Sequence, residues 1–274
     1  MATLAENPVS TVAKGLVEVE DLSIVFKRKD RHGPLLVLES TTFTIRPGEF
    51  ACLLGPSGCG KSTILNLIAG FLHPTKGHVF VDGRPVKEPG ADRGFVFQQY
   101  SLLPWKTTFQ NVEFGLKIRG VSRAERTELV NDYLNRVGLY QHRHSYPYQL
   151  SGGMQQRASI VRALVNSPSV LLMDEPFAAL DAQTRHMMQE LLLNIWSDLR
   201  STVVFVTHDI EEAIFLSDRI FVMGVNPGRI KEIVQVDLER PRHVDSILSP
   251  AFVQLNRQVF ELIREETLKS MELN

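Results

Sequence analysis

The spacing of apolar residues changes along the chain, and each change predicts a different kind of element. Runs rich in β-branched and aromatic residues come first and predict strands over 15–26, 35–45 and 49–55. From Lys61 onward the apolar residues take helical spacing, which predicts a helix with one buried face. In the second half, the apolar runs VLLM, TVVFV and RIFVMG alternate with helical stretches. Buried parallel strands are continuous apolar runs of this kind, so the pattern predicts a doubly wound α/β core.

Between these two parts the chain is predicted to be largely helical. The segment 121–139 begins with Ser122 and Glu125 at capping-box spacing and ends with Gly138, a common residue after a helix. Its predicted buried stripe consists of Leu129, Val130, Tyr133 and Leu134. Together with a helix that starts in the 150s, this segment predicts a helical block over roughly 109–165 inside the α/β core.

Two peripheral segments have simple predicted roles. The basic run 27–34, KRKDRHGP, lies between the first two strands and is expected to be a solvated hairpin loop. Past Val236 only a tail remains, and its apolar residues fall on one helical stripe: Phe252, Leu255, Val259, Leu262 and Ile263. Glutamates on the opposite face disfavour a membrane-surface role. We expect this tail to pack on the core or on a second copy of the chain.

Composition narrows the class of protein without naming a function. The 274 residues are 43% apolar and 22% charged with a net charge of −1, which is ordinary for a soluble globular protein and provides no general attraction to nucleic acid or anionic lipid. The two cysteines, Cys52 and Cys59, have no metal-ligand or redox spacing and are expected to be reduced thiols. We see neither a signal peptide nor an apolar run long enough to span a bilayer, so any work at a membrane needs a partner.

The segment GPSGCGKST, residues 55–63, carries the first candidate chemistry. It matches the pattern G-x-x-x-x-G-K-[ST], with a predicted strand before it and a predicted helix after it. Glycines let such a loop turn its backbone N–H groups inward onto phosphates. We expect Lys61 to reach the outer phosphates and Ser62 to offer its hydroxyl to Mg²⁺.

Acidic residues that could complete this site follow a buried strand. In VLLMDEP, Asp174 lies at the predicted carboxyl end of the strand, where ligands of open sheets bind, and Glu175 follows as a candidate base or water-orienting group. The run TVVFVTHD has the same arrangement and ends with His208, which has either a structural role or a contact with a γ-phosphate.

A second anion site is predicted at LSGGMQQR, residues 150–157. A serine and two glycines precede a helical run, so the unpaired N–H groups of the first turn carry almost no side-chain cover. Such helix starts favour bound anions. One phosphate-binding loop is already present, and a second such site therefore needs an explanation.

Taken together, these motifs closely resemble the ATP-binding cassette (ABC) family. GPSGCGKST looks like the Walker A motif, VLLMDE the Walker B motif and LSGGMQQR the family signature. FAALD resembles the D-loop, Gln98 the Q-loop glutamine and His208 the switch histidine. The resemblance implies a P-loop NTPase core with an antiparallel β subdomain and an inserted helical subdomain. It implies an ATPase domain over 15–240, with the helical subdomain at about 100–166, and a helical tail over 241–274.

The same resemblance assigns site residues by motif. It implies catalytic roles for Glu175, His208 and Gln98, and Mg²⁺ coordination by Ser62, Gln98 and Asp174. It implies ATP contacts from Gly55, Pro56, Ser57, Gly58, Cys59, Gly60, Lys61, Ser62 and Thr63, and from Ser151, Gly152, Gly153, Gln155 and Asp181. The family commonly stacks the adenine on an aromatic residue near the end of the first strand, often tyrosine; the candidate here is Phe26, which cannot add a hydroxyl contact.

The resemblance also explains the second anion site. It implies a head-to-tail homodimer, or a pair with a related cassette, in which each ATP lies between the P-loop of one copy and the signature of the other. One nucleotide cannot use two helix starts unless they converge, and the signature lies on the helical insertion, free to face outward. ATP then joins the two copies, and hydrolysis loosens them.

Within the family, the segments 89–116, 174–196 and 207–223 look like ATPase subunits of bacterial nitrate, sulfonate and taurine importers. The resemblance implies two permease subunits, a periplasmic or lipoprotein solute-binding protein, a place at the cytoplasmic face of the plasma membrane, and no nucleic acid. Leu102–Trp105 is a candidate contact for a permease helix, or else an ordinary buried cluster. The solute itself is left open among taurine, other sulfonates, nitrate, and aromatic or heterocyclic precursors.

Alternatives from other classes make different demands on the sequence. A soluble cassette ATPase of DNA repair needs a long coiled coil between the P-loop and the signature, and we find no sustained heptads there. A ribosome-associated member carries two cassettes, whereas we see one set of these motifs. A nucleotide sensor without turnover is expected to lack Glu175 or Lys61, and both residues are present.

A further expectation concerns Cys59. Its neighbours in the loop are positive, which favours a reactive thiolate that MgATP protects, whereas a small gap-filling residue is the simpler alternative.

Overall fold

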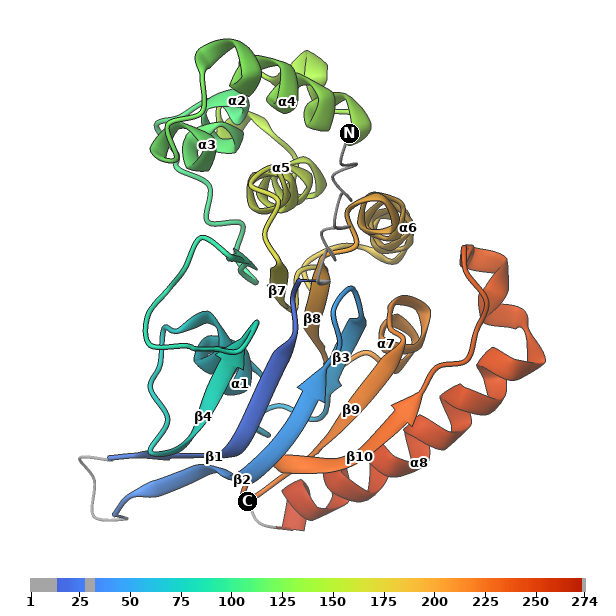
Figure 1. Ribbon diagram of the computed structural model, residues 1–274. Helices are drawn as coiled ribbons and strands as arrows, with labels where there is room; N and C mark the ends of the chain where they lie inside the picture. The colour runs from blue at the N-terminus through green and yellow to red at the C-terminus, as the bar shows by residue number, and fades with distance from the viewer. Residues whose placement is uncertain (1–13, 28–32, 273–274) are drawn as a thin grey trace, which may run out of the picture.

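The computed structural model describes residues 14–27 and 33–272, and its strands form two sheets (Figure 1). The predicted loop 27–34 lies largely outside these residues. A four-stranded antiparallel sheet has the order β2-β1-β4-β5, with β1 at Val17–Phe26, β2 at Leu35–Ile45, β4 at Lys76–Val81 and β5 at Arg84–Pro85. A six-stranded sheet has the order β10-β9-β3-β8-β7-β6, with β3 at Phe50–Leu54, β6 at Arg93–Val96, β7 at Val170–Asp174, β8 at Thr202–Thr207, β9 at Arg219–Gly224 and β10 at Arg229–Gln235.

The six-stranded sheet is the parallel core that the apolar runs predict. Its strands pair in parallel from β6 to β9, and only β10 at the edge is antiparallel. Each of the three predicted strands of the first part also forms, as β1, β2 and β3. The apolar pattern predicts none of β4, β5, β6 and β10, which are short or partly exposed and lack a long apolar run.

Alternating side chains of β3 divide the interior into two layers. Ala51 and Leu53 pack with the small sheet and with α1, Lys61–Ala69. Phe50, Cys52 and Leu54 pack on the opposite face, among the residues of the later helices. Those helices are α5 at Gly152–Leu164, α6 at Ala182–Leu199, α7 at Ile210–Leu216 and α8 at Pro250–Glu272. The helix after the P-loop and the helix after the signature therefore cover opposite faces of one sheet.

The predicted helical block gathers at one end of the molecule, above α5 in Figure 1. It contains α2 at Thr108–Val112, α3 at Phe114–Ile118, α4 at Arg123–Arg136 and two 3₁₀ turns at Tyr140–His142 and Pro147–Gln149. The Ser122 hydroxyl accepts a hydrogen bond from the backbone N–H of Glu125 at 3.3 Å, as a helix cap requires. Val130, Tyr133 and Leu134 are buried and Leu129 is partly buried, so the predicted stripe is correct.

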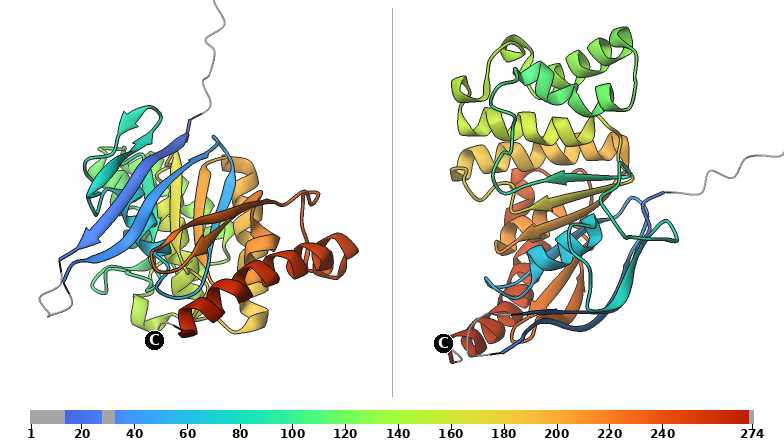
Figure 2. Two further views of the ribbon diagram at one scale, coloured as in Figure 1. Left: turned by 90° about the horizontal axis from the view of Figure 1, so that it is seen from below. Right: turned by 90° about the vertical axis from the view of Figure 1, so that its left-hand side faces the viewer.

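The tail folds back along the rest of the chain, and its helix α8 is visible along its whole length at the lower right of the left view in Figure 2. A 3₁₀ turn at Val244–Leu248 leads into it, and Phe252 and Val259 are buried in the same core as α5 to α7. The carboxylate of Glu266, only 1% exposed, accepts a hydrogen bond from the Val225 backbone N–H at 3.1 Å. Of the two expected packing surfaces, the chain uses its own core. The domain boundaries at 240 and at 100–166 stay predictions.

Within the described residues, every helix is too short or too polar to cross a bilayer.

Candidate functional site

The loop 55–60 connects β3 to α1 and curls around a single lysine. Gly58 and Gly60 have φ of 82° and 97°, a backbone conformation that residues with a Cβ rarely adopt. A Cβ on Gly60 would lie 2.6 Å from the terminal methyl group of the Leu38 side chain, which would have to shift. The buried Lys61 ammonium donates hydrogen bonds to the carbonyls of Gly55 at 2.7 Å and Pro56 at 3.0 Å. These contacts hold the positive charge of Lys61 inside the loop, close to its backbone groups.

The predicted metal-binding pair meets at the start of α1. The Ser62 hydroxyl donates a hydrogen bond to Oδ1 of Asp174 at 2.9 Å, and Asp174 is the last residue of β7. Burial raises the pKa of the Asp174 carboxyl, although the Ser62 hydrogen bond opposes that effect. Gln98 is exposed and follows β6, whose Val96 pairs with Met173, so its backbone leaves the sheet at the edge where Asp174 lies.

Two of the three candidate catalytic groups are in direct contact. Oε2 of Glu175 lies 3.0 Å from Nδ1 of His208. An ionised carboxylate can only accept, so the imidazole proton belongs on Nδ1 in this contact. Glu175 has φ of 43°, an unusual backbone conformation, and its N–H donates to the Val206 carbonyl at 3.0 Å. The turn after β7 therefore directs this carboxylate across to the end of β8.

The signature segment begins α5, as predicted. The Ser151 hydroxyl accepts a hydrogen bond from the Met154 N–H at 3.3 Å and caps the helix. The Gln155 amide donates to the Leu150 carbonyl at 3.2 Å. Gly152 lies against the Tyr100 hydroxyl, which would be 2.9 Å from a Cβ at that position. The sequence does not reveal Tyr100 as a neighbour of Gly152, because a contact between residues 52 positions apart in the chain leaves no local pattern.

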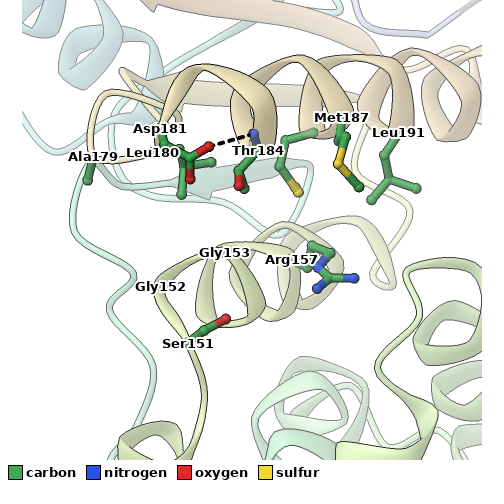
Figure 3. Close-up of a pocket in the computed structure, with 11 residues that line it drawn as sticks. Ser151, Gly152, Gly153, Arg157, Ala179, Leu180, Asp181, Thr184, Met187 and Leu191 are labelled. Atoms are coloured by element: carbon green, nitrogen blue, oxygen red, sulfur yellow. Dashed lines mark hydrogen bonds between the residues drawn. The ribbon is translucent and has the colours of Figure 1, made fainter.

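A cavity of about 490 Å³ opens between α5 and α6, and its lining does not include the P-loop (Figure 3). Ser151, Gly152 and Gly153 line one side, and Asp181 and Thr184 the other. Asp181 caps α6 by accepting a hydrogen bond from the Thr184 N–H at 3.0 Å, and that bond lowers the pKa of its carboxyl. The structure thus joins the predicted signature and D-loop residues to each other, separately from the P-loop.

The remaining predicted residues differ in how exposed they are. Phe26 ends β1 and is partly exposed, and its proposed adenine contact stays a prediction. In the P-loop, Ser57 is exposed and Thr63 half-buried. The reactive thiolate expected at Cys59 is wrong: the side chain is fully buried, and burial raises the pKa of the thiol although Lys61 opposes this. The ATP contact expected of this loop residue stays a prediction. The simpler alternative, a small residue that fills a gap beneath the loop, fits this position.

Comparisons with known proteins agree with these motifs. The family model described as ABC transporter matches residues 38–178. The nitrate import ATP-binding protein NrtD of Synechococcus elongatus is 42% identical over 96% of this chain and 97% of its own length. The taurine import ATP-binding protein TauB of Rhizobium johnstonii is 44% identical over 93% of this chain and 99% of its own length. A solved dimeric structure of the ATP-binding cassette MJ0796, in a post-hydrolysis state with ADP and Pi, has a TM-score of 0.72 at 33% identity and covers 81% of this chain and 100% of its own.

An ATPase cassette is the class of protein that this fold and this site define. The chain belongs to the ABC transporter family.

Proposed function

We propose that this chain is the ATP-hydrolysing subunit of an importer for a small anionic solute such as taurine, another sulfonate or nitrate. Two relatives that match nearly the whole chain are import ATP-binding proteins for nitrate and taurine, and they support this solute class. The observation that carries the proposal is the line of groups along the carboxyl edge of the large sheet: Ser62 with Asp174, and Glu175 with His208. Such a line suits a triphosphate and an attacking water.

ATP binding falls to the P-loop. Backbone N–H groups of 55–60 and the start of α1 hold the phosphates, with Lys61 as the point charge between them. Phosphate oxygens compete with the carbonyls of Gly55 and Pro56 for the Lys61 ammonium, so binding exchanges one set of acceptors for another. Phe26 stacks on the adenine from the end of β1.

Mg²⁺ is the metal that the donor set fits. A hydroxyl and a carboxylate 2.9 Å apart, with an amide oxygen from Gln98 at the same sheet edge, are hard oxygen ligands. In the described part of the chain, three or more His, Cys, Asp or Glu side chains nowhere gather into a metal cage. This suits Mg²⁺, which is usually held by one or two carboxylates and the phosphates themselves. When bound, the metal offsets the negative charge of the phosphoryl oxygens.

Hydrolysis needs a group that accepts the proton of the attacking water. Glu175 is the candidate base, and His208 holds its carboxylate through the 3.0 Å contact. In this geometry Nδ1–H of His208 is used by Glu175. Nε2 can donate to a γ-phosphate oxygen only in the imidazolium form, in which both ring nitrogens carry a proton. Gln98 orients the water from the neighbouring strand end.

A pair of copies completes each site. Because α1 and α5 cover opposite faces of the sheet, and the cavity around Ser151 lacks P-loop residues, we assign the signature to the partner's nucleotide. The solved relative with ADP and Pi is a dimer, which supports a two-copy assembly. The partner is an identical copy or a related cassette.

Leu102–Trp105 is the surface that we assign to a permease subunit. Trp105 is 69% exposed, although an isolated cassette gains nothing from holding a large aromatic side chain in water. Leu102 and Leu103 are half-buried, and the Asn111 side chain accepts a hydrogen bond from the Leu103 N–H at 2.7 Å. The segment is thus held firmly while Trp105 stays accessible, as a receiving surface for a helix requires. The complete system adds a periplasmic or lipoprotein solute-binding protein, and this chain lies at the cytoplasmic face of the plasma membrane.

Copurification and transport test this proposal together. A tagged chain should copurify with a polytopic membrane subunit, and vesicles with the whole system should take up the anion when ATP is supplied. Trp105→Ala should reduce uptake by about tenfold or more, because exposed tryptophans that become buried are common hot spots. Phe260→Ala changes an exposed aromatic residue on α8 and serves as the matched control. Unchanged uptake by Trp105→Ala, with normal ATP binding, rejects the docking role.

A further inference from the structure

Three polar pairs join α6 to α7 beside the catalytic groups. Arg185 Nη1 lies 3.2 Å from Oδ2 of Asp209, and the Gln189 amide donates to Glu212 at 3.0 Å. His186 and Glu211 form the third and loosest pair, at 3.8 Å. Directional contacts of this kind fix how two helices lie along each other, which apolar packing alone does less well.

Arg185 also contacts the turn that precedes its own helix. Its Nη2 donates a hydrogen bond to the Leu180 carbonyl at 3.1 Å. Leu180 comes directly before Asp181 and lines the signature cavity with it. A single guanidinium therefore links the loop before α6 to the loop before α7. Its planar, rigid set of donors suits two acceptors at fixed positions, as a lysine ammonium does not.

Asp209 is fixed from its other side as well. Its Oδ1 accepts the Glu212 N–H at 3.1 Å and caps α7, while its own N–H donates to the Thr207 hydroxyl at 3.0 Å. One carboxylate oxygen thus serves the helix and the other serves Arg185. His208 lies between Thr207 and Asp209, so the backbone that carries it is held at both neighbours.

We propose that Arg185 is a positioning residue for ATP hydrolysis. It ties the loop 177–181, which belongs to the surface assigned to the partner, to the turn that sets His208 against Glu175. A shift of the first loop is then passed to His208 through one side chain. The inference rests on the proposed roles of Glu175 and His208 and adds a residue whose hydrogen bonds go to Asp209 and Leu180 instead.

Arg185→Gln is the test variant, because it keeps polar character but cannot bridge Leu180 and Asp209. We expect kcat to fall about 10- to 100-fold, as small displacements of a catalytic group do, with KM for ATP changed by less than about threefold. Asp209→Asn should have the same effect, since asparagine still caps α7 but loses the charge that holds Arg185. The double variant should be no worse than the single ones. Arg257→Gln removes an exposed arginine and its ion pair on α8 and is the matched control.

The outcomes separate the inference from the function on which it rests. Near-normal kcat in both Arg185→Gln and Asp209→Asn overturns the inference, as do additive losses in the double variant. If Arg185→Gln does not fold, Asp209→Asn alone decides between the two outcomes. A wild-type chain without ATPase activity, or a Glu175→Gln variant with full activity, overturns the proposed function instead.

Discussion

Replacing Glu175 by glutamine changes the proposed base and almost nothing else. The side chain keeps its shape, and its amide can still hydrogen bond to Nδ1 of His208, now 3.0 Å from Oε2. The backbone at φ of 43°, with its bond to the Val206 carbonyl, does not depend on the charge. The variant loses only the ability to accept a proton. The structure therefore predicts a chemical defect in a folded, nucleotide-binding protein.

The expected size of the defect follows from general-base catalysis. Such a base contributes about 10²- to 10⁴-fold, which at 1.36 kcal/mol per factor of ten is roughly 3–5 kcal/mol of barrier. Phosphate release in a single turnover measures this loss, and retention of labelled ATP measures binding. Because Lys61 and the P-loop are untouched, the affinity for ATP should stay within about threefold of wild type.

A matched variant and a clear negative result complete the design. Glu232→Gln removes an exposed carboxylate on β10 and should hydrolyse ATP at the wild-type rate. If Glu175→Gln retains hydrolysis within about threefold of wild type, Glu175 is not the base, and the reasoning from the contact with His208 is refuted.

Two further predictions concern stability. Burial raises the pKa of Glu212 from 4.5 to about 6, so the folded state binds this proton more tightly and loses stability as pH rises from about 4.5 through 6. The free energy of unfolding of Glu212→Gln, taken relative to wild type, should therefore be up to about 2 kcal/mol higher at pH 7.5 than at pH 4, as measured by urea unfolding. A difference between the two proteins that does not depend on pH contradicts the assignment. Phe252→Ala should lower the free energy of unfolding by about 3–5 kcal/mol, because Phe252 packs α8 on the core. Val253 is 57% exposed, so Val253→Ala should lower it little. Equal losses in the two variants mean that the tail is not part of the cooperative fold.

Much of the architecture could be predicted because the apolar spacing is strong where the chain is buried. The strands that end in Asp174 and in Thr207 are almost wholly buried, and their continuous apolar runs reveal them. The edge strand 93–96 has only one fully buried residue, so little in its composition distinguishes it from a loop. Tertiary contact, not local pattern, stabilises such strands.

The site could be predicted as far as each residue belongs to a local motif. The P-loop, Asp174 and the start of α5 are of this kind. The reactivity expected for Cys59 failed because the sequence shows neighbouring charge but not burial, and burial has the larger effect on this thiol. Arg185 and Asp209 are 24 positions apart, and their contact exists only because α6 and α7 pack side by side.

The central claim is that each working site needs the P-loop of one copy and the signature of the other. Lys61→Ala disables the first half-site and Ser151→Arg the second, so each variant alone should be inactive. Mixing them in equal amounts should restore about a quarter of wild-type ATPase activity, because random pairing gives half mixed dimers, each with one intact site of two. A mixture that stays as inactive as its components, or either variant fully active by itself, would contradict the account.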